Sequence, residues 1–288
     1  MLARLFGGGC MVRRWAAAVV VMLVVTACGG SQDGAAGEGG PGETGSPPSS
    51  GKEISGLVEI GAGRKVFVEC KGAGSPTVVF ESGDTDDHRV WSAVVESVSV
   101  LARTCTYDRL GNGVSSPASG CRRLKDLRGD LEALLRTVGE TGPYVLVGTS
   151  GGGFLMAGFA YAHPKDTAGL VLVETPRAII PERAPPGLLA DLKCDSPENR
   201  ERRDYVAIES AAWTSRRKIG DIPMSVISND YGKAYSNAEE RTNVADQKGW
   251  FLLSPQARQV IVTSGHAVPQ HEPDVVVKEI DRVLDAAR

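Results

Sequence analysis

The chain has 288 residues, 42% of them hydrophobic, which is enough for a globular protein with a sizeable core. Its formal net charge is −3, and residues 1–27 hold three arginines and no acidic residue, so the remainder carries −6. This acidic balance argues against a nucleic-acid partner, which needs a basic surface. There is also no metal-ligand spacing and no phosphate-binding glycine loop, so no metal or other cofactor is expected.

Residues 1–27 have the pattern of a signal peptide. Basic residues precede an apolar run over residues 15–25, which is short for a membrane span. The sequence Val25-Thr26-Ala27-Cys28 resembles the lipobox of bacterial lipoproteins. The resemblance implies cleavage before Cys28 and lipid attachment to its thiol. The alternative is an ordinary secretory signal or an uncleaved anchor. Either Met1 or Met11 can be the first residue of the protein.

A flexible tether is expected over residues 28–55, which are rich in glycine, serine and proline. A tether behind a lipid-modified cysteine would hold a domain clear of a membrane. The sequence therefore predicts a membrane partner through the anchor and an extracytoplasmic location. Residues 56–288 are long enough for one domain with a single core.

Within that domain, short apolar runs alternate with segments of helical spacing, which predicts a mostly parallel sheet covered on both faces. The expected strands are Gly56–Ile60, Lys65–Cys70, Thr77–Glu81, Thr104–Asp108, Tyr144–Gly148, Gly169–Glu174, Met224–Ser228 and Gln259–Thr263. The expected helices are Val90–Ser97, Leu124–Val138, Gly152–Ala162 and Pro273–Ala287.

A serine lies where the fifth expected strand meets the following helix. Gly148-Thr149-Ser150-Gly151-Gly152 is a G-x-S-x-G motif, and its place between strand and helix makes a chance match improbable. Such a turn exposes the hydroxyl and needs glycines where strand and helix nearly touch. A serine hydroxyl requires a base, an acid that orients the base, and donors for the oxyanion.

From residue 57 to the C-terminus the chain resembles the α/β-hydrolase family. Besides the serine motif, the segments at residues 78–83, 107–115, 169–174 and 264–266 carry this resemblance. It implies an α/β-hydrolase fold with a mostly parallel eight-stranded sheet and helices on both faces. It also implies a small lid at residues 176–220, between strands six and seven; a solvated excursion without a role in substrate choice is the alternative.

The resemblance implies the order serine, acid, histidine for a catalytic triad. His266 and His271 follow the last strand, and His266 is assigned as the base because Gly265 lets the loop turn back over the sheet. Glu174, after strand six, is favoured as the acid, with Asp230, after strand seven, as the alternative. Both carboxylates can orient an imidazole.

The oxyanion donors implied by the family are the backbone N–H groups of Gly151 and Asp84. Here the chain departs from the family, because Asp84 stands where relatives carry an uncharged residue. Its carboxylate would oppose an oxyanion unless it turned to solvent. With Asp86 and Asp87 it would alternatively select a cationic or hydroxyl-rich substrate.

Four cysteines of the domain are expected in disulfides, as is usual outside the cytoplasm. Four cysteines can form two disulfides in three ways, and the sequence alone does not choose among them. In the family, strands two and four are neighbours, and this implies Cys70–Cys105, which leaves Cys121–Cys194.

The resemblance as a whole implies a serine hydrolase that cleaves carboxylic esters of small or medium acyl groups through an acyl-enzyme, without a cofactor. A serine at this position, in place of aspartate, disfavours dehalogenase or epoxide hydrolase chemistry, which relatives perform with a carboxylate. The alternatives are an aminopeptidase-type hydrolase or a non-catalytic surface lipoprotein that uses the scaffold for binding.

Overall fold

The computed structural model describes residues 51–184, 187–230 and 238–288. The expected signal peptide, the lipidation residue Cys28 and most of the tether lie outside the described residues, as do Met1 and Met11. Within the described ranges, no helix is both long and apolar enough to cross a membrane.

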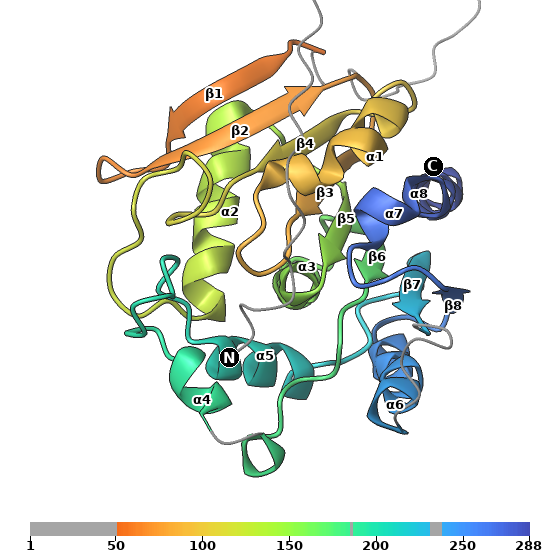
Figure 1. Ribbon diagram of the computed structural model, residues 1–288. Coiled ribbons are helices and arrows are strands. Elements are labelled where there is room, and N and C mark those ends of the chain that lie inside the picture. The colour runs from red at the N-terminus through yellow and green to blue at the C-terminus, as the bar shows by residue number, and fades with distance from the viewer. Residues whose placement is uncertain (1–50, 185–186, 231–237) are drawn as a thin grey trace, which may run out of the picture. The chain divides into compact units, whose positions relative to one another are not determined.

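One sheet of eight strands runs through the described part of the chain (Figure 1). Its strands are β1 Ile54–Glu59, β2 Lys65–Lys71, β3 Thr77–Glu81, β4 Thr104–Tyr107, β5 Tyr144–Thr149, β6 Thr167–Val173, β7 Met224–Asn229 and β8 Ala257–Val262. Their order is β1-β2-β4-β3-β5-β6-β7-β8. The β1–β2 and β2–β4 pairs are antiparallel and the other pairs are parallel, so the carboxyl ends of β3 to β8 share one edge.

Helices cover both faces of this sheet. They are α1 Ser92–Val98, α2 Leu124–Val138, α3 Gly151–Ala162, α4 Leu188–Asp191, α5 Tyr205–Thr214, α6 Ala238–Gln247, α7 Val268–His271 and α8 Pro273–Ala287. Side chains of α1 and α8 form one buried cluster with the strands, and those of α2, α3 and α5 form another. These layers, with the strand order, confirm the predicted α/β-hydrolase fold.

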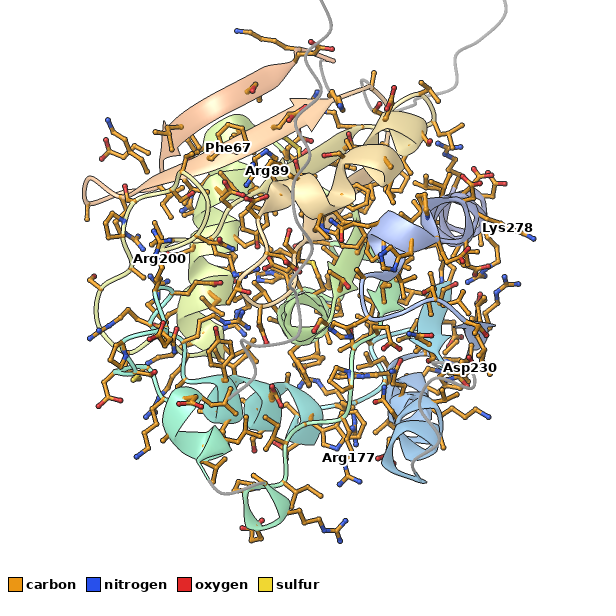
Figure 2. The ribbon with its side chains drawn as sticks, in the orientation of Figure 1. Phe67, Arg89, Arg177, Arg200, Asp230 and Lys278 are labelled. Atoms are coloured by element: carbon orange, nitrogen blue, oxygen red, sulfur yellow. A yellow bond between two sulfur atoms is a disulfide. The ribbon has the colours of Figure 1, made fainter. Side chains whose placement is uncertain are left out.

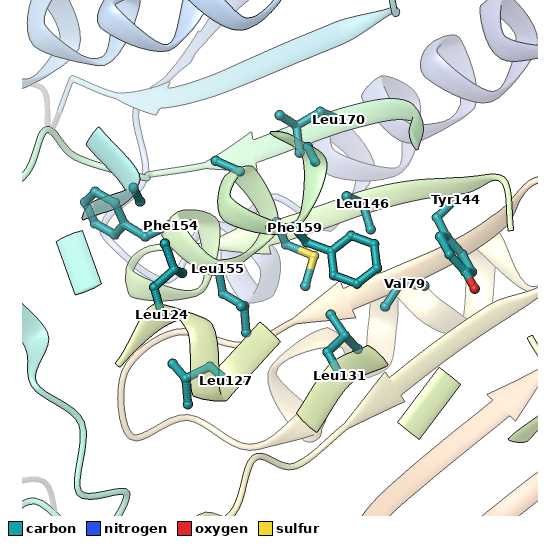
Figure 3. Close-up of a cluster of buried hydrophobic side chains, with 14 of the residues drawn as sticks. Val79, Leu124, Leu127, Leu131, Tyr144, Leu146, Phe154, Leu155, Phe159 and Leu170 are labelled. Carbon is teal, nitrogen blue, oxygen red and sulfur yellow. The ribbon is translucent and has the colours of Figure 1, made fainter. Parts of the chain in front are cut away.

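The packing of α2 and α3 positions the serine motif. Leu124, Leu127 and Leu131 recur at helical spacing on α2 and meet Leu155 and Phe159 of α3 over the central strands (Figure 3). Nearly all of α3 is buried. Because a buried helix is fixed on all sides, its first turn holds a defined position at the end of β5.

The structure contains helical segments that the sequence pattern did not predict. In the expected lid, residues 176–220, α4 and α5 are helical, and α6 lies between β7 and β8. The α6 sequence has no apolar stripe, so hydrophobic periodicity gives no signal for it. The predicted strands and helices otherwise occur, with shifts of one or two residues at their ends.

Two disulfides join the pairs expected from the resemblance. Cys70 and Cys105 lie directly opposite each other on β2 and β4 and are joined at an S–S distance of 2.03 Å. Cys121, just before α2, is joined to Cys194 in the insertion, 73 residues further on. Such bonds form in oxidising compartments, which supports an extracytoplasmic environment.

Candidate active site

Ser150 occupies the sharp turn between β5 and α3. Its backbone has φ +50° and ψ −127°, a conformation that costs energy for a residue with a side chain. The turn is held by the Ser150 N–H, which donates to the Val173 carbonyl on β6 at 2.8 Å. A Cβ on Gly152 would lie 2.4 Å from the Ser82 carbonyl oxygen, so the turn requires glycine there.

His266 reaches this serine from the loop after β8. Its Nε2 lies 2.9 Å from the Ser150 hydroxyl oxygen, across 116 residues of sequence. The imidazole is 59% exposed, so a substrate can approach the pair from solvent. Hydrogen-bond contact between a serine and a histidine is the arrangement in which the ring can accept the hydroxyl proton.

Glu174 lies on the other side of the imidazole. Its Oε2 is 3.5 Å from His266 Nδ1, a separation within the looser range common in unliganded sites. Its Oε1 accepts hydrogen bonds from the Asn229 N–H at 2.6 Å and from Gln247 Nε2 at 3.1 Å. The carboxyl group is almost fully buried, and these donors keep it in one orientation.

Asp230, the alternative acid, follows β7 (Figure 2). Its Oδ1 accepts a hydrogen bond from the Thr263 hydroxyl at 2.8 Å, and its N–H donates to the Val262 carbonyl. Both contacts attach Asp230 to the end of β8. The side chain is exposed, in contrast to the buried carboxyl group of Glu174.

Nearby acids make the imidazole more basic. The hydrogen bond to Glu174 is the largest cause that raises the pKa of His266 above its ordinary value, and partial desolvation of the ring by neighbouring groups acts in the opposite direction. The negative charges of Asp86 and Asp84 raise the pKa further. Asp86 also lines a polar cleft of about 370 Å³, together with Thr85, Asp87, Arg89, Val90 and Gln270.

The carboxylate of Asp84 turns only partly to solvent, with 35% of its side chain exposed, so solvent alone does not screen its charge from an oxyanion. It lies against the first residue of α3, since a Cβ on Gly151 would be 2.0 Å from Asp84 Oδ1. The same oxygen accepts a hydrogen bond from Arg203 Nη1 at 2.6 Å. The charge is therefore paired within the protein.

Two arginines beside this loop, Arg109 after β4 and Arg203 in the insertion, were not among the site residues predicted from the sequence. Both are buried. A charged run such as residues 198–204 is typical of a solvated surface, so the only usable signal was the presence of acids and bases in equal number.

Comparisons with known proteins agree with this architecture. A family model described as alpha/beta hydrolase fold matches residues 76–193. A thermophilic esterase from Thermogutta terrifontis superposes with a TM-score of 0.61 at 20% identity, over 82% of this chain and 99% of that one. The epoxide hydrolase VrEH1 of Vigna radiata gives a TM-score of 0.64 at 17% identity, over 82% and 99% of the two chains.

A curated relative shares part of this chain. The probable transporter efuK of Hormonema carpetanum is 30% identical over 138 residues, which are 45% of this chain. The match covers 20% of that protein, so the chain spans about a fifth of the relative's length. Taken with the sheet order and the two helical layers, these similarities show that the chain has the α/β-hydrolase fold, and the family match supports its placement among the α/β-hydrolases.

Proposed function

We propose that this protein is a serine hydrolase that cleaves carboxylic esters of small or medium acyl groups. The observation that carries the proposal is the 2.9 Å contact between the Ser150 hydroxyl and His266 Nε2, on a turn whose backbone is strained to present the serine. The esterase among the similar structures supports hydrolase chemistry in this fold. A serine nucleophile favours esters over epoxides, which relatives open with a carboxylate.

The reaction follows from these contacts. Ser150 Oγ attacks the acyl carbonyl carbon while His266 Nε2 accepts the hydroxyl proton. The tetrahedral intermediate collapses, and the imidazolium returns the proton to the departing alcohol oxygen. Water then attacks the acyl carbonyl carbon while His266 accepts a proton from it, and the imidazolium returns that proton to Ser150 Oγ as the acyl–Oγ bond breaks and the acid leaves. The N–H groups of Gly151 and Asp84 are proposed to hold the oxyanion at both stages.

Glu174 is the acid we assign to this triad. A buried carboxylate at 3.5 Å from Nδ1 favours a proton on that nitrogen, so that Nε2, which faces Ser150, acts as the base. Its charge also stabilises the imidazolium that forms during attack. The exposed side chain of Asp230, attached to Thr263, is less suited to this role.

The proposal extends to the location of the enzyme. The two disulfides support an oxidising compartment, and the sequence before the domain resembles a lipoprotein signal. We place the enzyme outside the cytoplasm, attached to the cell membrane through a lipid at Cys28. Metabolic labelling with a fatty-acid analogue tests this, since Cys28→Ala should abolish incorporation and release the protein from membranes.

A fluorophosphonate probe tests the nucleophile. We expect it to label the wild-type protein at Ser150 and to leave Ser150→Ala unlabelled although folded. A panel of 4-nitrophenyl esters of increasing acyl length, with a choline ester and a peptide amide, then defines the substrate. Hydrolysis of the amide alone would favour the aminopeptidase alternative. A folded wild-type protein that neither labels nor hydrolyses any of them would favour a non-catalytic binding protein.

A further inference from the structure

The chain places a carboxylate beside the proposed oxyanion position, which by itself would be unfavourable for catalysis. Asp84 supplies one of the proposed N–H donors, and its side chain lies against Gly151, which supplies the other. A negative charge beside the donor groups opposes the charge that develops on the substrate oxygen, and this repulsion is strong where water is scarce. Some feature of the protein must offset it.

Arg203 provides that feature from the insertion between β6 and β7. Its side chain is 2% exposed, and Nη1 donates to Asp84 Oδ1 at 2.6 Å, across 119 residues of sequence. A buried cation that donates a hydrogen bond to a carboxylate opposes the field of that carboxylate, and charge-assisted pairs of this kind are strong. The exposed fraction of the Asp84 side chain is 35%, so the pair lies at the border between the protein interior and the site.

Backbone hydrogen bonds of the residues before and after Arg203 attach its segment to Arg122. The Arg122 N–H donates to the Arg202 carbonyl at 2.7 Å, and the Asp204 N–H donates to the Arg122 carbonyl at 2.8 Å. The Cys121–Cys194 disulfide lies next to this short parallel bridge. The arginine is therefore held in place by the backbone and does not depend on a closing lid.

A second arginine orients the donor peptide itself. Arg109 Nη1 donates to the Ser82 carbonyl and Nη2 to the Gly83 carbonyl, each at 2.7 Å. The cis peptides of the described residues both precede proline, so the Gly83–Asp84 peptide is trans, with its C=O and N–H pointing in opposite directions. An arginine that fixes the Gly83 carbonyl therefore directs the Asp84 N–H away from itself.

Glu201 connects the two arginines. Its Oε1 accepts from Arg109 Nη2 at 2.8 Å, and its Oε2 lies 3.8 Å from Arg203 Nη1. Arg109 also pairs with Glu81 at the end of β3. A continuous set of buried charges thus runs from the sheet to Asp84, with two residues of the insertion as members.

From these contacts we infer that the insertion completes the oxyanion site, with Arg203 as a positioning residue that acts through Asp84. The inference rests on the proposed function, because it concerns the oxyanion of the same reaction. Arg203 neutralises the Asp84 carboxylate and keeps it out of the oxyanion position. Arg109, fixed by Glu201, holds the peptide whose N–H binds the oxygen.

A single variant and a double variant, each of which removes charge, test this inference with 4-nitrophenyl acetate as the substrate. Arg203→Met leaves the Asp84 charge unpaired, and we expect kcat to fall about ten- to hundredfold, with KM changed less than about threefold, since the effect acts on the transition state. Adding Asp84→Asn to Arg203→Met should recover at least about tenfold of the lost kcat, because no charge remains to oppose the oxyanion.

Arg103→Met is the matched control. Arg103 is equally buried and pairs with Glu140 at 2.9 Å, but it precedes β4, at the opposite end of the strands from Ser150. It should lower stability and leave unchanged the kcat per serine titrated with the fluorophosphonate.

Two results would overturn the inference while the proposed function stands. One is wild-type kcat in Arg203→Met; the other is a loss in Arg203→Met that Asp84→Asn does not relieve, which would assign Arg203 to folding alone. A wild-type protein without Ser150-dependent turnover would overturn the proposed function as well.

Discussion

The Glu174 carboxylate accepts a hydrogen bond from the backbone N–H of Asn229 at 2.6 Å, so the acid that follows β6 is fixed by the end of the neighbouring strand β7. This contact is made by Oε1, whereas Oε2 lies 3.5 Å from His266 Nδ1. The orientation of the carboxylate is thus set by β7 together with Gln247 at the end of α6.

Replacement of this acid should reduce the chemical step. Glu174→Gln keeps the shape but removes the charge that stabilises the imidazolium, and we expect kcat to fall by about 10³–10⁴. Asp230→Asn is the comparison, measured by steady-state hydrolysis of the same ester. A larger loss in Asp230→Asn than in Glu174→Gln would assign the acid to Asp230.

The pH dependence of activity should reflect the acids around His266. The histidine acts as a base only when neutral, and its pKa is raised by Glu174 first and also by Asp86. The rising limb of kcat/KM should therefore lie above the ordinary pKa of histidine, about 6.5. Asp86→Asn removes one negative charge, and we expect the limb to move to lower pH. A limb that stays in place would show that Asp86 does not act on the imidazole.

The features that sequence could predict are those set by local pattern. Ser150 stands between a buried strand and a buried helix, and this context alone predicts the strained turn. His266 was identified by its place after the last strand, and the structure brings it to Ser150. In both cases a short segment of chain contains the whole signal.

Relationships between distant segments could be predicted only where the family resemblance implies them, as it does for the two disulfides. Glu174 and Asp230 follow adjacent strands, so only the geometry at the ends of β6 and β7 distinguishes them. Arg203 and Asp84 are 119 residues apart, and charged residues ordinarily face solvent. Their burial depends on the path of the insertion, which no periodic pattern records.

The Cys121–Cys194 disulfide should support both stability and activity. It closes a loop of 73 residues that contains the serine and ends near Arg203. Replacing both cysteines with alanine should lower the free energy of unfolding by about 2–4 kcal/mol and also reduce kcat, because the segment that carries Arg203 loses one attachment. Urea denaturation and ester hydrolysis measure the two effects. Cys70→Ala with Cys105→Ala is the control, expected to destabilise without affecting kcat per folded enzyme.

Glu209, in α5 of the insertion, should make stability depend on pH. Burial is the largest cause that raises its pKa, to about 7, and the Asp84 charge adds to it; the Ile179 N–H and Arg203 act in the opposite direction. Because the folded pKa lies above the unfolded value, the stability from the protonated form is complete below about pH 4 and is lost as pH rises toward 7.

Glu209→Gln should remove this dependence. Its amide oxygen can still accept the Ile179 N–H, and it carries no charge at any pH. We expect the variant to match the wild type near pH 4 and to exceed its free energy of unfolding by up to about 3 kcal/mol at pH 8, as measured by urea denaturation. Glu96→Gln, on the exposed face of α1, should change stability by less than about 0.5 kcal/mol at either pH. Equal stability of Glu209→Gln and wild type at pH 8 would mean that the folded protein holds Glu209 ionised without cost, in contradiction to the burial argument.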